Sequence, residues 1–346
     1  MKYVEHPYFS LIIPCYNSKK TIARLLNSVV AQNMAAEIQV ILADDHSTES
    51  YDDEIRPFYD KLCIERIMTD YNCCPGNTRE KGTTIARGEW LVFADHDDTF
   101  LPNTFREVQK QIRKNEEPYI AYCNIYRAQN TTGKYTEDLK QIEMTTFTGL
   151  LHGKFFNREN FWNKFDIHFK KDMFTHEDTY VTSIAKCVLN HLDRDPLHID
   201  IFDYVWFNNS KSLSNANGVQ RFLEDNFCYF VEGTSEVYRE YYNKGFITAD
   251  FAVRQLISSI VYDYFYMQLF LFHNPSNYVK SNAPLCRNNL KMVKQMFNLT
   301  NADVFWYCGE DNAALYSAIC LEAGFGYIPT YSFYEWLNVL DKDKEE

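Results

Sequence analysis

The chain has 346 residues, a length that suggests about two domains. Hydrophobic residues make up 46% and charged residues 24% of the sequence, which excludes a disordered or low-complexity chain. The 47 acidic residues outnumber the 35 basic ones and give a formal net charge of −12, so no nucleic acid is expected as a partner.

The 10 cysteines are scattered, without the paired spacing of a zinc knuckle. The N-terminal residues lack the charged and apolar regions of a signal peptide. Both features favour reduced thiols and a cytoplasmic protein. The most apolar stretch, residues 251–272, is interrupted by Arg254 and Asp263, which favours a buried helix over a membrane-surface contact.

The first 130 residues alternate between apolar runs and amphipathic segments, which is typical of an α/β domain with a mostly parallel sheet. In chain order we expect a strand at 9–15, a helix at 21–32, strands at 38–43 and 63–68, a helix at 78–87, a strand at 90–94, a helix at 103–115 with Asn103 as N-cap, and a strand at 119–126. After about residue 215 the pattern becomes helical, at 219–243, 247–273, 285–297 and 310–323, and the terminal DKDKEE is expected to fray.

Polar side chains follow three of these strands where each strand ends. They are Tyr16, Asn17 and Ser18, then Asp44 to Thr48, and then Asp95, His96, Asp97 and Asp98. Because α/β sheets bind ligands beyond the carboxyl ends of their strands, we expect these residues to form one site.

The three carboxylates of Asp95, Asp97 and Asp98 lie within four residues, directly after a buried strand. Like charges repel, and a divalent cation such as Mg²⁺ would neutralise them while substrate phosphates complete its shell. On the triplet alone, a solvated turn with an aspartate N-cap is the alternative.

Asp44 and Asp45 are also typical of a turn, but a carboxylate there can accept hydrogen bonds from a ribose or a base. Arg79 is predicted to lie at the start of a helix, where a phosphate or base can bind. The alternative interpretation of Arg79 is a surface ion pair. Phosphate loops of the GxGxxG and P-loop types and the GxSxG elbow are absent, which disfavours dehydrogenases, P-loop NTPases and α/β-hydrolases.

Together the segments SLIIPCYN, QVILADDHST, NTREKG and GEWLVFADHDD resemble the nucleotide-binding half of family 2 glycosyltransferases of the GT-A fold. The order and spacing match over residues 8–105, and HGKFF and EDTYV within 152–184 and the later Tyr204 and SLS resemble further family segments. The resemblance implies a GT-A domain at 1–215, with a nucleotide-binding half at about 8–105 and an acceptor half at about 106–215. It does not cover residues 216–346, where the helical pattern predicts a separate helical domain.

The chain departs from the family pattern at a few positions. His46 stands where glycine is usual, Glu80 replaces the asparagine of A-R-N, His96 fills the variable slot of D-x-D, and Asn208 or Asn209 stands where arginine is often found. None of these departures removes a carboxylate that the family's chemistry needs.

The resemblance implies inverting transfer of a sugar from a nucleotide-sugar, commonly a UDP-sugar, to an acceptor hydroxyl. Asp97 would be the direct ligand of Mn²⁺ or Mg²⁺ on the diphosphate, with Asp95 and Asp98 beside it. The nucleotide pocket would comprise Pro14, Tyr16, Asn17, Asp44, Asp45, Arg79, Asp95, His96 and Asp97, with Asp45 near the uracil.

For the acceptor side, the resemblance implies that Asp178 is the general base and that Glu177 orients it or touches the acceptor. The alternative is an acidic pair that favours a helix start. Lys154 would help to position acceptor or leaving group unless it is a surface lysine. Trp206 would form a sugar platform unless it is a core residue.

The expected acceptor is a glycan or lipid-linked glycan of a surface polymer. Association with the inner membrane surface and a homo-oligomer formed through the C-terminal helices stay open.

Two other functions are alternatives to glycosyl transfer. A nucleotidyltransferase would need a basic, Gly-rich loop near the N-terminus, where Lys19-Lys20 is the only basic pair and no glycine lies between Met1 and Met34. A non-catalytic nucleotide-sugar-binding module is disfavoured because the acidic residues are retained.

Overall fold

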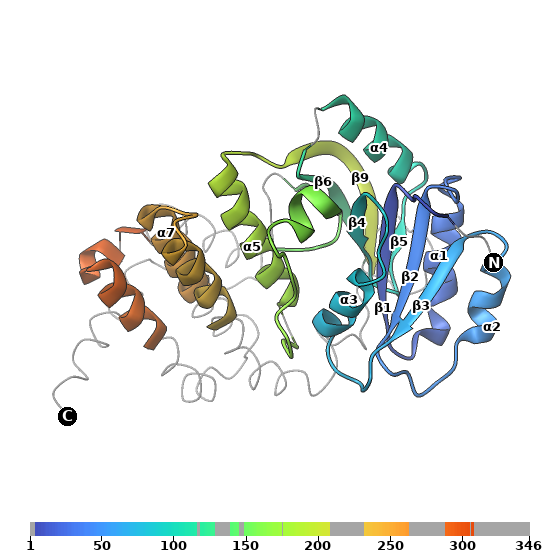
Figure 1. The fold of residues 1–346 in the computed structure, drawn as a ribbon, viewed down its shortest axis with the longest axis horizontal. Helices are drawn as coiled ribbons and strands as arrows, with labels where there is room; N and C mark the ends of the chain where they lie inside the picture. Colours follow the sequence, from blue (N-terminus) through green and yellow to red (C-terminus); the bar gives the residue numbers. More distant parts are fainter. Residues whose placement is uncertain are drawn as a thin grey trace. The chain divides into compact units, whose positions relative to one another are not determined.

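The computed structural model describes residues 4–115, 118–128, 139–144, 149–174, 176–207, 232–262, 288–304 and 306–307. The chain divides into two compact units, Met1–Ala216 and Asn217–Glu346. Figure 1 shows the helices and strands of both units.

The first unit is built on one nine-stranded sheet in the order β3-β2-β1-β4-β8-β6-β9-β5, with β7 paired to β6. The strands are β1 (Phe9–Cys15), β2 (Ile38–Asp44), β3 (Cys63–Met68), β4 (Trp90–Phe93), β5 (Thr99–Phe100), β6 (Ile120–Ala128), β7 (Leu139–Ile142), β8 (Lys154–Asn157) and β9 (Leu197–Phe207). The strands β1 to β4 pair in parallel, whereas β8 pairs antiparallel with both β4 and β6. The predicted α/β fold class is confirmed, and antiparallel pairs extend its sheet.

Helices cover both faces of the parallel strands. The helices of the first unit are α1 (Ile22–Val30), α2 (Asp52–Ile55), α3 (Pro75–Thr83), α4 (Thr104–Lys114) and α5 (Glu177–Leu192), with helical turns η1 (Ser18–Lys20), η2 (Arg56–Phe58) and η3 (Arg158–Asn163). Leu25 and Leu26 of α1 share a core cluster with Leu11 of β1. The next residue, Ile12, faces α3, because a Cβ on Gly82 would lie 2.6 Å from its side chain. Successive side chains of a strand point to opposite faces, so β1 is apolar throughout.

Two predicted helix starts differ from the structure in detail. Helix α3 begins at Pro75 rather than Thr78, as the preference of proline for the first helical turn explains. Arg79 therefore lies inside the helix, and its predicted place at the opening was wrong. Asn103 is the N-cap of α4, as predicted, but it has φ 62° and its side chain makes no capping hydrogen bond.

The second unit is helical where the structure describes it, at 232–243, in α7 (Ala249–Tyr262) and at 288–297. These helices agree with three of the predicted helical segments. The predicted helix at 310–323 and the terminal tail lie outside the described residues. Among the described residues, no helix is both long and apolar enough to cross a membrane.

One carboxyl group is buried in the core of the first unit. Asp203 of β9 is 0% exposed, and neither of its carboxylate oxygens has a hydrogen-bond partner among the described residues. Its Oδ1 lies 3.2 Å from the place that a Cβ on Gly153 would take. Because burial disfavours the charged form, the pKa of Asp203 is raised to about 8, and the group is protonated at neutral pH.

This raised pKa predicts that Asp203→Asn stabilises the protein increasingly as the pH rises. Between pH 4 and the folded pKa of about 8, the folded state holds a proton that the unfolded state has lost. The free energy of unfolding of the wild type then falls by up to about 1.4 kcal/mol per pH unit relative to the variant. Urea unfolding at pH 5, 6, 7 and 8 measures this difference.

The exposed Asp195, which precedes β9, supplies the control, because Asp195→Asn removes a carboxyl without changing the core. A stability difference between Asp203→Asn and the wild type that stays constant over this pH range would show that Asp203 is ionised in the folded protein.

Candidate active site

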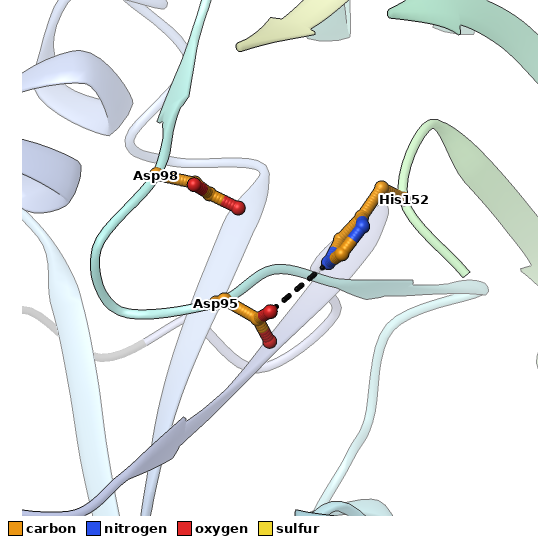
Figure 2. Close-up of side chains that lie close together, drawn as sticks. All are labelled: Asp95, Asp98 and His152. Carbon is orange, nitrogen blue, oxygen red and sulfur yellow. Dashed lines mark hydrogen bonds and ion pairs between the residues drawn. The ribbon is translucent and has the colours of Figure 1, made fainter. Parts of the chain in front are cut away.

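Asp95, Asp98 and His152 form a cluster in which one ligand atom of each lies within 4.8 Å of the others. Asp95 and Asp98 lie in the loop after β4, and His152 lies just before β8 (Figure 2). Val92 of β4 pairs with Phe155 of β8 in an antiparallel register. This register brings the start of β8 to the end of β4, which is why a histidine 57 residues away meets Asp95.

The loop after β4 is fixed by β9. The buried carboxylate of Asp98 accepts hydrogen bonds from the Tyr204 hydroxyl at 2.7 Å and from the Phe207 amide at 2.8 Å. The same hydroxyl accepts a hydrogen bond from the amide of Asp95 at 2.9 Å. Burial raises the pKa of Asp98 well above its usual value, so this carboxyl is hard to ionise without a nearby cation.

His152 joins the cluster through its ring nitrogen Nε2. Nε2 lies 3.2 Å from Asp95 Oδ2, and the ring stacks on Tyr204 with centroids 5.0 Å apart. The buried Nδ1 has no hydrogen-bond partner among the described residues. Burial lowers the pKa of His152, but the charge of Asp95, its hydrogen bond and the charge of Asp98 together outweigh burial, and the net shift is upward.

Two carboxylates and an imidazole with an unpartnered nitrogen suit a divalent cation such as Mn²⁺. Of the predicted ligands, Asp95 and Asp98 belong to this cluster and Asp97 does not. The carbonyl of Asp97 accepts a hydrogen bond from Arg24, and the neighbouring His96 bonds Thr21 Oγ1 at 2.7 Å. His152 was missed by the sequence analysis because its role depends on strand pairing and not on a local motif.

Arg79 connects the loop after β4 to the start of α5. Its Nη2 donates to Asp95 Oδ1 at 2.6 Å and its Nη1 to Glu177 Oε1 at 2.5 Å. Its side chain is only 7% exposed, so the alternative of a surface ion pair was wrong. Burial disfavours the charge of Asp95, but Arg79 and His152 hold the pKa of Asp95 well below its usual range.

Glu177 and Asp178 form the first turn of α5, after His176 with φ 59°. Asp178 Oδ1 accepts a hydrogen bond from the Thr179 amide at 2.7 Å. Burial raises the pKa of both carboxyl groups. A carboxylate with a raised pKa is a stronger base near neutral pH, which suits the role expected for Asp178.

The ends of β1, β2 and β3 are held together by the residues predicted for the nucleotide pocket. Asn17 Oδ1 accepts hydrogen bonds from the amides of Thr48 and Glu49 at 3.0 and 3.1 Å. Asp44 accepts one from the amide of Ser47 at 2.7 Å. Asp45 accepts hydrogen bonds from the Cys73 amide and Asn72 Nδ2 at 2.9 and 3.0 Å.

Tyr16 follows β1 and is 43% exposed, so its ring can contact a ligand. Pro14 lies inside β1, paired with Ala43 of β2. His46 has φ 57°, a left-handed conformation that glycine adopts without strain. This conformation explains why the resembling family usually has glycine there.

Lys154 is 0% exposed and donates a hydrogen bond to the carbonyl of Leu150, so the alternative of a surface lysine was wrong. Burial lowers its pKa to about 7. Trp206 is half-buried, with its ring centroid 6.4 Å from that of His152 and the Arg127 guanidinium 4.7 Å above it.

Residues 10–177 match the sequence profile of glycosyl transferase family 2. A poly(ribitol-phosphate) beta-N-acetylglucosaminyltransferase, TarS of Staphylococcus aureus, is 34% identical over 101 residues, which are 29% of this chain and 18% of that protein. The Escherichia coli protein WfaP, a UDP-Glc:alpha-D-GlcNAc-diphosphoundecaprenol beta-1,3-glucosyltransferase, is 31% identical over 121 residues, 34% of this chain and 45% of WfaP. The matches thus span less than half of either relative.

The fold is shared with a solved structure. The crystal structure of S. aureus TarS 1–349 in complex with UDP-GlcNAc aligns with a TM-score of 0.63 and 19% identity, over 86% of this chain and 83% of that one. The sheet that carries the acidic cluster is therefore a GT-A sheet. Residues 10–177 of this chain are therefore similar in sequence to glycosyl transferase family 2.

Proposed function

We propose that this protein is an inverting glycosyltransferase that moves a sugar from a UDP-sugar to a hydroxyl of a glycan or lipid-linked glycan. The observation that carries the proposal is the double ion pair of Arg79, which joins the acidic loop after β4 to the acidic start of α5. The relatives support the substrate class, because their names specify sugar transfer to poly(ribitol-phosphate) and to a lipid diphosphate sugar.

Asp178 is the proposed general base. Glu177 is engaged by Arg79, whereas Asp178 forms no ion pair among the described residues. Asp178 is partly buried, and its raised pKa strengthens it as an acceptor of the proton that the attacking hydroxyl loses. Glu177 then has a positioning role, because it holds Arg79 beside the first turn of α5.

On the donor side, Asp95, Asp98 and His152 would hold the divalent cation, with Asp97 in the same loop. Bound there, Mn²⁺ or Mg²⁺ supplies Lewis-acid stabilisation of the diphosphate leaving group. Tyr16, Asn17, Asp44 and Asp45 would line the nucleotide site at the ends of β1 and β2, with Pro14, Arg79 and His96 nearby.

Nucleotide selectivity gives the first test. We expect UDP with Mn²⁺ to raise the melting temperature by a few degrees, since a ligand at 100 times its dissociation constant adds about 2.7 kcal/mol. GDP, CMP and dTDP are the matched comparison, and EDTA should abolish the UDP effect. Equal shifts with all four nucleotides, or none, would contradict the proposed donor.

The metal site predicts that His152→Ala weakens Mn²⁺ binding about 10- to 100-fold, because an imidazole ligand is lost. Mn²⁺ binding is measured by electron paramagnetic resonance on the free protein, so no substrate is needed. His168→Ala, which changes a partly exposed histidine outside the cluster, is the control. If Asp97→Ala weakens binding while His152→Ala does not, the cation is held as the sequence pattern suggested and not by His152.

Asp178→Asn should lower kcat about 10²- to 10⁴-fold, because the neutral amide cannot accept the proton of the hydroxyl. Release of UDP from UDP-sugars in the presence of glycan acceptors measures turnover, and the UDP thermal shift of the variant should stay that of the wild type. Full activity in Asp178→Asn would place the base elsewhere. A wild type that binds UDP without turnover would instead support the non-catalytic binding module.

A further inference from the structure

A segment of the chain that we name the strap, residues 164–174, runs from the end of η3 towards α5. Helix α3, which also carries Arg79, contacts the strap at two places. Asn77 Nδ2 donates to Asp172 Oδ1 at 2.8 Å, and the Asp172 amide donates to Asn77 Oδ1 at 2.9 Å. The amide of Phe169 donates to Glu80 Oε2 at 3.0 Å.

The backbone of the strap is not one that the local sequence favours. Asp166 and Asp172 have φ values of 53° and 59°, and His176, next to α5, has 59°. Left-handed residues other than glycine cost free energy, and they persist only where surrounding contacts fix them. The three hydrogen bonds from α3 are such contacts.

Glu80, which binds the strap, departs from the family pattern, in which asparagine is usual at this position. Its side chain is partly buried. Burial raises its pKa, and the hydrogen bond from the Phe169 amide opposes that shift. The ring of Phe169 lies 5.5 Å from that of Phe93 on β4. Glu80 therefore fixes the strap at a point where the strap also packs on the sheet.

We propose that Glu80 is a positioning residue which, with Asn77, sets the place of the first turn of α5 relative to the donor site. The proposal rests on the proposed function, in which Asp178 is the base. Helix α3 holds Asp95 through Arg79 and holds the strap through Asn77 and Glu80. One rigid helix thereby fixes the separation between the leaving group and the base, to which transfer rates are sensitive.

The close approach of α3 to α5 makes this coupling tight. A Cβ on Gly76 would lie only 3.1 Å from the Cβ of Glu177, so the backbone of α3 at Gly76 packs directly against the Glu177 side chain. The helix that holds the strap through Asn77 and Glu80 is therefore also in direct contact with the first turn of α5.

The test compares Glu80→Gln, which keeps a carbonyl oxygen for the Phe169 amide, with Glu80→Leu, which removes the acceptor. We expect Glu80→Leu to lower kcat about 10- to 100-fold with the KM for the UDP-sugar unchanged. Glu80→Gln should stay within about twofold of the wild type, as rescue by a conservative variant. Thr84→Ala, at the exposed C-cap of α3, is the control.

Hydrogen exchange supplies a readout that does not depend on turnover. Peptides covering the strap and the first turn of α5 should exchange faster in Glu80→Leu than in Glu80→Gln, while those of β1 and β2 stay unchanged. Equal exchange in both variants would overturn the proposal even if the wild type proves inactive, and inactivity itself counts only against the proposed function. A kcat equal to that of the wild type in Glu80→Leu, or an equal loss in both variants, would also overturn it.

Discussion

The arrangement of the site depends on one buried guanidinium. Arg79 is the cation between Asp95 in the loop after β4 and Glu177 at the start of α5. Removing one partner of a buried ion pair leaves an uncompensated charge, which is far costlier than losing a surface pair. The position of the loop after β4 and the start of α5 therefore depend on each other, through the helix that carries Arg79.

The parallel half of the sheet could be predicted from the sequence because β1, β2 and β4 are apolar on both faces and each is followed by polar residues. The strands β8 and β9 were not predicted, because four residues and an alternating half-exposed pattern give little signal. Those two strands complete the site. His152 precedes β8, and β9 supplies the hydroxyl and amide that hold Asp98, so the most informative part of the cluster depended on tertiary pairing.

Side-chain environments were harder to predict than positions. The sequence pattern located Lys154 and Arg79 within the right segments, but gave no sign that both are nearly inaccessible to solvent. Burial results from strands and helices that arrive from far along the chain, so no local pattern encodes it. His46 differs from these two residues, because its departure from the family pattern was visible in the sequence alone. Its left-handed backbone then explains why glycine is usual at that position.

The electrostatics of the site favour a functional explanation over a structural one. A fold selected only for stability would replace buried carboxyl groups with apolar ones, because each ionised group loses its hydration. Here burial raises the pKa of Asp98, Glu177 and Asp178 in one region, and Arg79 and His152 compensate only part of that charge. A divalent cation at Asp95 would supply further positive charge on one side. On the other side, Asp178, the proposed base, keeps the raised pKa that suits proton transfer.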